Sequence, residues 1–170
     1  FLTRTLAIVG STDPADAAEV DASLRQVDSL LALCESHLNH ENRFVHPALE
    51  RARPGSAALI AAEHVHHQES PADLRDLASL VAHSADAARG AALQRLYRAL
   101  ALFVAENLQH MHVEETAHNA VLWAAYSDAQ IMEIEQAIVG SIPPVEMADM
   151  LHWFFPALNA PERAGMLAGM

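Results

Sequence analysis

The 170-residue chain has a mass of 18.4 kDa, which is enough for one domain but too little for two independent hydrophobic cores. Its formal net charge of −12 and its pI near 5.2 provide no basic face for a phosphate backbone, so we expect no nucleic-acid partner. Apolar residues make up 52% of the chain, too many for a disordered protein of this charge, yet no apolar run reaches the length of a membrane span.

Cysteine usage indicates the redox environment. The single cysteine, Cys34, cannot form an internal disulfide, and no basic and apolar secretion signal stands at the start of this sequence. We therefore expect a soluble protein of the reducing cytoplasm that makes no contact with a membrane.

The composition predicts an all-α fold, because glycine is scarce and aromatic residues make up only 5% of the chain. A short first helix begins the sequence and is predicted to end at Gly10. A second helix follows, with Asp13 as its N-cap and Pro14 at its first position, and extends to about Arg53.

A Pro-Gly turn separates the second helix from a third, which we expect Ser56 to cap and His83 to end. Within it, Pro71 predicts a kink rather than an end. A loop over residues 84–90 then leads to a fourth helix over about 91–126.

Three shorter helices complete the chain. Two are expected to start at capping boxes and one at a proline pair: Ser127 with Gln130, Pro143 with Pro144, and Asn159 with Glu162. Residues 1–126 are predicted to form an up-down four-helix bundle with a truncated first helix. Residues 127–170 are predicted to pack on that bundle as part of the same domain.

Histidine is unusually frequent, with 11 residues against 10 Lys plus Arg. On three of the long helices, imidazoles and carboxylates occupy positions of the apolar face at three-and-four spacing. The second helix carries His37 and Glu41 there, the third carries His64 and His67, and the fourth carries His110 and Glu114.

These polar patches are expected at one level of the bundle. Glu41 and His67 both lie 13 residues from the turn at Pro54, about 20 Å along antiparallel helices. Counting from the next loop places His110 within about 4.5 Å of the same level.

Two carboxylates and four imidazoles in one apolar layer are costly to bury unless a cation compensates them. Imidazole nitrogens and carboxylate oxygens without thiolates suit iron, manganese or zinc. Because six such ligands exceed the needs of one tetrahedral zinc ion, the pattern favours a dinuclear centre.

The three motifs resemble the hemerythrin-like, or HHE cation-binding, family over residues 1 to about 126: HLNHENRFVHPALE, AAEHVHH and LQHMHVEE. The resemblance implies a four-helix bundle with a non-haem di-iron centre. It also implies that Glu41 and Glu114 bridge the metals, and that His37, His64 and His110 are terminal ligands. His67 departs from the family's pattern, which spaces its two third-helix histidines four apart, whereas His64 and His67 are three apart.

The family takes a fifth histidine from the first helix, and none is present there in this sequence. That ligand is expected upstream of Phe1, or water completes the site, or His40 or His112 substitutes. The remaining histidines, among them His46 and His118, fall off the apolar faces, so we expect them behind the ligands or on the surface. His46→Ala is accordingly expected to leave metal binding nearly intact.

Three other patterns have alternative interpretations. Glu63 with His66 and Glu115 with His118 match the Glu-x-x-His signature of ferritin-like di-iron proteins, on faces adjacent to the apolar ones. Cys34 is expected to be a core residue rather than a redox thiol. Apolar residues of the C-terminal segment are expected to cover the bundle or to form a homodimer surface: Met147, Met150, Leu151, Trp153, Phe154 and Phe155.

No general base or nucleophile stands apart from the candidate ligands, so the sequence favours binding or sensing over catalysis. The expected partner is a small diatomic ligand such as dioxygen or nitric oxide, and the expected cofactor is di-iron, with zinc or manganese as alternatives. A ferritin-like or peroxidase-like di-iron oxidase and a metal-free helical interaction module remain the alternative functions.

Overall fold

The computed structural model describes residues 1–168, with side chains described for residues 1–58, 60 and 70–168. The all-α prediction is confirmed, because the described part of the chain contains helices and turns but no strand. No helix among these residues has both the length and the apolar character needed to cross a bilayer. The chain divides into two compact units, Phe1–Ile134 and Glu135–Met170.

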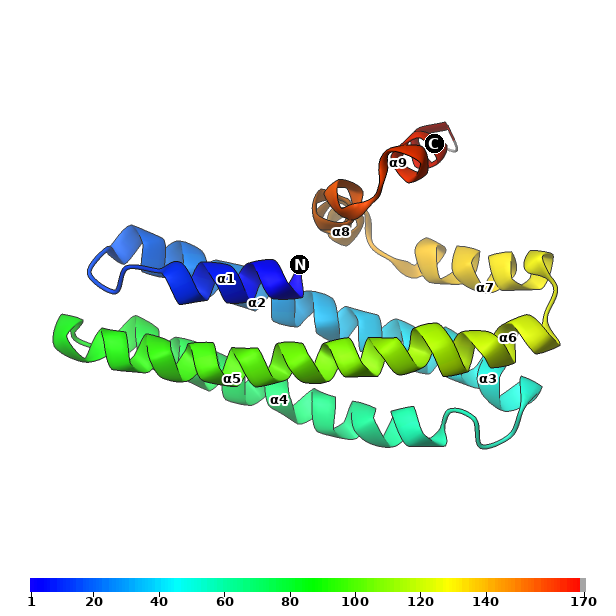
Figure 1. Cartoon of the computed structure of the whole chain (residues 1–170), viewed down its shortest axis with the longest axis horizontal. Coiled ribbons are helices and arrows are strands. Elements are labelled where there is room, and N and C mark those ends of the chain that lie inside the picture. Colours follow the sequence, from blue (N-terminus) through cyan, green and yellow to red (C-terminus); the bar gives the residue numbers. More distant parts are fainter. Residues whose placement is uncertain (169–170) are drawn as a thin grey trace. The chain divides into compact units, whose positions relative to one another are not determined.

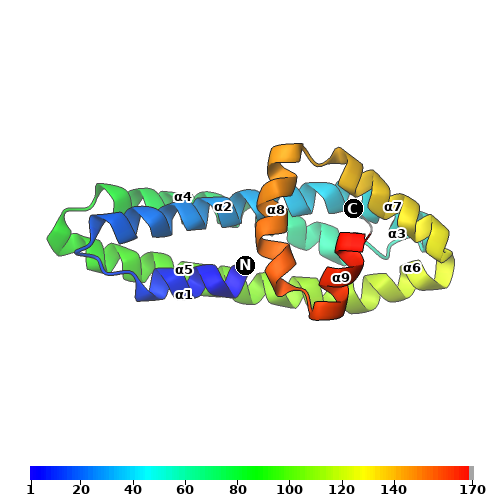
Figure 2. The same cartoon turned by 90° about the horizontal axis from the view of Figure 1, so that it is seen from above.

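Four helical rods run up and down in the first unit (Figures 1 and 2). The first and third rods are single helices, whereas the second and fourth each contain a short π-helical segment between two α-helices. The elements are α1 (Leu2–Ser11), α2 (Ala17–His40), η1 (Glu41–Val45), α3 (His46–Ala52), α4 (Ala58–His83), α5 (Asp86–Val113), η2 (Glu114–His118) and α6 (Asn119–Ala125). The predicted bundle with a short first helix is confirmed.

The hydrophobic core lies between α1, α2, α4 and α5. Leucine and valine side chains at helical spacing fill it, since these positions form one face of each helix. Its fully buried members include Val27, Leu30, Leu31, Val81, Leu96 and Leu100. Cys34 packs against this cluster while half-buried, as expected for a core thiol.

The start of α2 differs from the prediction. Asp16, not Asp13, is the N-cap, and its carboxylate accepts hydrogen bonds from the backbone N–H groups of Ala18 and Glu19. The Asp13 carboxylate instead accepts the N–H of Ala15 within the preceding turn.

The cap of α4 was also predicted incorrectly. Ala57 is the N-cap residue, and the Ser56 hydroxyl donates to the carbonyl of Leu49 in α3. The turn residue Gly55 has a φ of 85°, a conformation that glycine adopts without strain. The Glu50 carboxylate of α3 accepts the N–H groups of Gly55 and Ala57 in this turn.

The fourth rod begins earlier than predicted. Helix α5 starts at Asp86 rather than near Ala91, so only residues 84 and 85 separate it from α4. The Arg89 side chain, which was expected in a loop, donates from the first turns of α5 to the carbonyl of Pro14. Helix α4 continues through Pro71 to His83, as predicted for its end.

Two polar contacts fix the second rod against its neighbours. Arg75 of α4 donates to both carboxylate oxygens of Glu35 in α2, at 2.6 and 2.9 Å, and this bond lowers the pKa of Glu35. Because both side chains are about 40% exposed, such a pair contributes no more than about 1 kcal/mol. At the other end, the Tyr126 hydroxyl donates to the Ala48 carbonyl and joins α6 to α3.

The two interruptions of the long rods were not predicted. In η1 the N–H of His46 bonds to the carbonyl of Glu41, and in η2 the N–H of Asn119 bonds to that of Glu114. These bonds span five residues, the pattern of a π-helix, which is rare and often lies at functional sites. Each interruption begins at the glutamate of a His-x-x-x-Glu motif.

The C-terminal helices start where their capping signals predicted. They are α7 (Asp128–Ser141), α8 (Pro144–Ala157) and α9 (Ala160–Ala168). Reciprocal bonds between Ser127 and Gln130 and between Asn159 and Glu162 form the two capping boxes. The packing of residues 127–170 on the bundle as part of one domain stays a prediction.

Candidate metal centre

The two interrupted rods run parallel to each other, since α4 reverses the chain between them (Figure 1). Each carries a histidine and a glutamate four residues apart, and one helical turn brings such side chains together. His37 Nε2 lies 3.0 Å from Glu41 Oε1, and His110 Nε2 lies 3.0 Å from Glu114 Oε1. The sequence therefore builds two identical histidine-glutamate pairs by local geometry alone.

The two pairs meet across the bundle. His37 Nε2 of the α2 rod lies 3.9 Å from Glu114 Oε2 of the α5 rod. One ligand atom from each of His37, Glu41 and Glu114 lies within 4.8 Å of the others, close enough to share a cation. The prediction that the second and fourth helices bring their polar patches to one level is confirmed.

The cluster is closed on one side and open on the other. The His110 side chain is 2% exposed, and those of Glu41 and Glu114 are 12% and 15% exposed. The His37 side chain, by contrast, is 49% exposed. Among the described side chains, the cluster is therefore most open to solvent at His37.

Electrostatics at the cluster favour charged groups. Burial acts to lower the pKa of His37, but the hydrogen bond to Glu41 and the charges of Glu41 and Glu114 outweigh it and raise that pKa. Burial likewise acts to raise the pKa of Glu41, but the bond from His37 and the fields of His37 and His110 lower it. Glu41 is thus an ionised, nearly buried carboxylate at neutral pH, a group that requires a positive partner.

Two further histidines lie inside the bundle, although they were expected behind the ligands or on the surface. His46 is 8% exposed and His118 is 4% exposed. Their rings contact each other edge to face, with centroids 6.2 Å apart and planes at 85°. Burial lowers the pKa of His46, so its imidazole is neutral at pH 7, the form that binds metals.

Helical counting missed this pair because each π-helical segment adds a residue to its turn. One added residue rotates everything beyond it by about 100°. On the fourth rod the counted face continues through Ala117, but Ala117 is exposed and His118 is buried. One sequence feature could have identified this pair: a histidine follows each motif glutamate by four or five residues.

The third rod cannot be compared with its prediction. His64 and His67 lie outside the residues whose side chains the structure describes, so their roles as ligands stay predictions. Of the proposed substitutes for a first-helix ligand, His112 is exposed and His40 stacks on Phe44 at 6.4 Å.

The ferritin-like alternative receives no support from the fourth rod. Glu115 of its Glu-x-x-His pattern is exposed, while His118 of the same pattern is buried. The corresponding Glu63 and His66 lie outside the described side chains.

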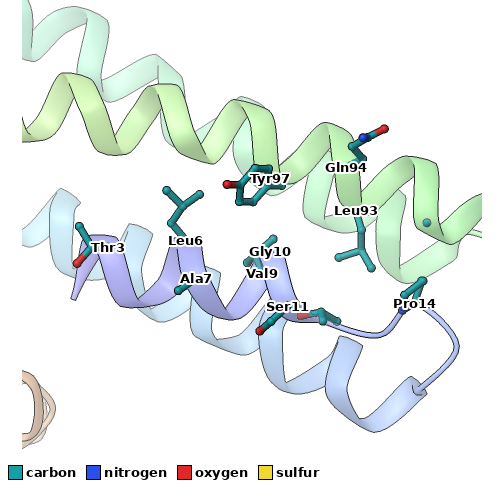
Figure 3. Close-up of a pocket in the computed structure, with 12 residues that line it drawn as sticks. Thr3, Leu6, Ala7, Val9, Gly10, Ser11, Pro14, Leu93, Gln94 and Tyr97 are labelled. Carbon is teal, nitrogen blue, oxygen red and sulfur yellow. The ribbon is translucent and has the colours of Figure 1, made fainter.

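A groove between α1 and α5 lies apart from these residues (Figure 3). It has a volume of about 770 Å³, and Leu6, Leu93 and Tyr97 are among the side chains that line it. No histidine, cysteine or carboxylate is among its described lining residues, so it offers no set of metal ligands.

The donor set of the cluster fits a transition metal. Two carboxylates from different rods can each offer oxygens to two ions, and imidazole nitrogens complete a nitrogen and oxygen set suited to iron, manganese or zinc. The model of the hemerythrin HHE cation-binding domain matches residues 3–121, more than half of the chain. The chain belongs to this family. As a hemerythrin HHE domain, it is a cation-binding helical protein, and its own histidine-glutamate pairs provide the candidate ligands.

No curated protein and no solved structure matches the chain. The roles of individual residues in this hemerythrin HHE domain therefore depend on the geometry of the chain itself.

Proposed function

We propose that this chain holds a dinuclear non-haem metal centre, di-iron in its working form, and that it binds or senses a small diatomic ligand such as dioxygen or nitric oxide. The observation that carries the proposal is the meeting of two nearly buried glutamates from parallel rods, each 3.0 Å from a histidine of its own motif. Two carboxylates at one point suit a pair of cations better than a single one.

The four residues of the two motifs have different proposed roles. Glu41 and Glu114 would bridge the two metals, and His37 and His110 would be terminal ligands. When bound, the centre supplies a redox-active metal with coordination positions left for a small ligand. The half-exposed His37 side marks the entry route, while the buried His110 side excludes bulk water.

Binding or sensing is favoured over catalysis because the cluster consists of ligand-type groups without a separate acid or base. A cytoplasmic location is part of the proposal, since the chain has one cysteine and that thiol is half-buried. A homodimer through the apolar C-terminal segment also stays a prediction.

The metal content tests the proposal directly. Anaerobic loading of the full chain with Fe(II) is expected to give two irons per chain by elemental analysis. Metal at 100 times its dissociation constant is expected to stabilise the fold by about 2.7 kcal/mol. Glu41→Ala and Glu114→Ala are each expected to abolish dinuclear binding, whereas Glu106→Ala, an exposed glutamate on α5, should retain it.

The reaction with gas distinguishes binding from oxidation. Stopped-flow mixing of the reduced, loaded protein with dioxygen is expected to give a spectral change that reverses when the gas is removed. Rapid irreversible oxidation would instead assign the chain to the di-iron oxidases. A chain that takes up no transition metal and whose melting temperature ignores added iron would be a metal-free interaction module.

A further inference from the structure

The buried pair His46 and His118 has no role in the centre described so far. Each residue lies on the inner side of its rod, and their rings contact each other edge to face at 6.2 Å. Deeper along the same two rods, inward positions are filled by apolar side chains such as Leu30 and Leu100. Burial of two imidazoles at this level calls for a compensating interaction, because burying polar groups costs free energy.

The pair lies next to the glutamates. His46 stands one π-helical turn beyond Glu41, and its N–H bonds to the Glu41 carbonyl. The charges of Glu41, Glu114 and His110 all act on the His46 imidazole, as does that of His118. On the other rod, His118 lies four residues beyond Glu114, one position before Asn119, whose N–H bonds to the Glu114 carbonyl.

The two parallel rods therefore present three successive pairs of side chains: His37 with His110, then Glu41 with Glu114, then His46 with His118. The glutamates lie between two pairs of histidines. Because a carboxylate has two oxygens, each glutamate can serve a cation on either side of it.

We propose that His46 and His118 are metal ligands, and that they bind the second metal of the centre together with Glu41 and Glu114. His37 and His110 then bind the first metal with the same two glutamates. Each metal then receives two imidazole nitrogens and two carboxylate oxygens without a ligand from the first helix, and coordination positions beyond these four stay available for a small ligand. This inference rests on the dinuclear centre proposed above.

The side chains must turn for this to happen. Among the described residues, the ligand atoms already within 4.8 Å of one another belong to His37, Glu41 and Glu114. Metal binding at the second position thus includes a change of rotamer at His46 and His118. The expectation that His46→Ala leaves metal binding intact is replaced by the opposite one.

The test compares His46→Gln with His118→Gln, singly and together, using glutamine to keep a polar side chain of similar size. The double variant is expected to bind one Fe(II) per chain where the unaltered protein binds two. The matched control is His40→Gln with His112→Gln, which changes one histidine of each of the same rods outside the cluster and should leave two metals bound. Far-ultraviolet circular dichroism of the metal-free variants checks their folding.

A second measurement uses the unaltered chain. In the protein loaded with Co(II) and labelled with ¹⁵N-histidine, ligating imidazoles give strongly shifted signals. His46 and His118 are expected among them, assigned by the loss of signals in the single variants.

The outcomes separate the two proposals. Two metals in the double variant with unchanged affinity, or unshifted His46 and His118 signals, overturns the inference while the dinuclear centre stands. If the unaltered chain binds no metal, the dinuclear centre itself is wrong. A single metal in the unaltered chain, unaffected by the glutamine variants, also overturns the inference.

Discussion

The rods α2–η1–α3 and α5–η2–α6 share one sequence motif and one backbone irregularity. Both carry His-x-x-x-Glu, both change to a π-helix at the glutamate, and both bury a histidine beyond it. They differ in what surrounds the design, since the His37 side chain is 49% exposed and that of His110 only 2%. The same local motif is thus open to solvent on the second rod and buried on the fourth.

A second difference lies beyond the π-helical segments. Helix α3 buries His46, Ala48 and Leu49, whereas α6 buries none of its residues. The second rod therefore continues into the core, while the fourth ends as a surface helix. Both rods supply candidate ligands, but α3 buries side chains that α6 does not. We therefore expect α3 to contribute more to the free energy of unfolding.

A further residue added to the second rod is expected to have the largest effect. Insertion of one alanine after the exposed Arg43 rotates α3 by about 100° relative to α2, which moves Leu49 out of the core. The expected loss is about 3 kcal/mol or more, as for a large core truncation. Insertion of one alanine after Thr116 in η2 should cost less than half as much, measured by denaturant unfolding of the metal-free proteins.

Substitutions at the same sites control for side-chain contacts. Arg43→Ala removes a cation–π contact with Phe44 but keeps the register, and Thr116→Ala removes a bond to the His112 carbonyl. Each should cost about 1 kcal/mol or less. Equal losses for the two insertions would contradict the difference between α3 and α6.

The histidines of the two motifs are expected to differ next. In the metal-free chain, His110→Ala leaves a cavity and a nearly buried Glu114 without its 3.0 Å partner, at a cost of about 2–4 kcal/mol. His37→Ala also leaves the nearly buried Glu41 without its 3.0 Å partner, but it opens no cavity at its half-exposed position, so it should cost less, about 1–2 kcal/mol. Thermal unfolding at pH 7 compares them, and a larger loss for His37→Ala would show that its side is not the open one.

The smallest expected effect concerns the residues one turn before the motif histidines. Cys34 stands there on the second rod, and burial raises the pKa of its thiol from 9.0 to about 12. Between these pH values the unfolded chain loses a proton that the folded chain keeps, so the thiol lowers stability as pH rises. The slope approaches about 1.4 kcal/mol per pH unit.

Asn107 is the matching residue on the other rod and provides the control. Its side-chain amide donates to the Phe103 carbonyl, a bond worth about 1 kcal/mol at any pH. In urea unfolding between pH 8 and 10.5, Cys34→Ala is expected to flatten the decline in stability, whereas Asn107→Ala should shift the whole curve. An unchanged slope in Cys34→Ala would mean that the thiol is accessible to solvent.

Much of the site could be predicted because its geometry is local. A spacing of four residues brings His37 to Glu41 and His110 to Glu114 in any α-helix, whatever surrounds it. The common level of the two pairs was predicted from loop positions, although the observed start of α5 at Asp86 lengthens the count from that loop to His110 from 20 residues to 24. Helix caps were less predictable, because several Asp and Ser residues near each start compete for the same donors.

The amino-acid order alone therefore specified the helices, the two histidine-glutamate pairs and their common depth, since all of these depend on contacts within one turn or on residue counts between turns. Packing decided the rest: the π-helical segments that rotate His46 and His118 inward, and the contrast between an exposed His37 and a buried His110. The physical reason is that the energy of a π turn and the burial of a side chain depend on neighbouring rods, which no periodicity within one segment reports.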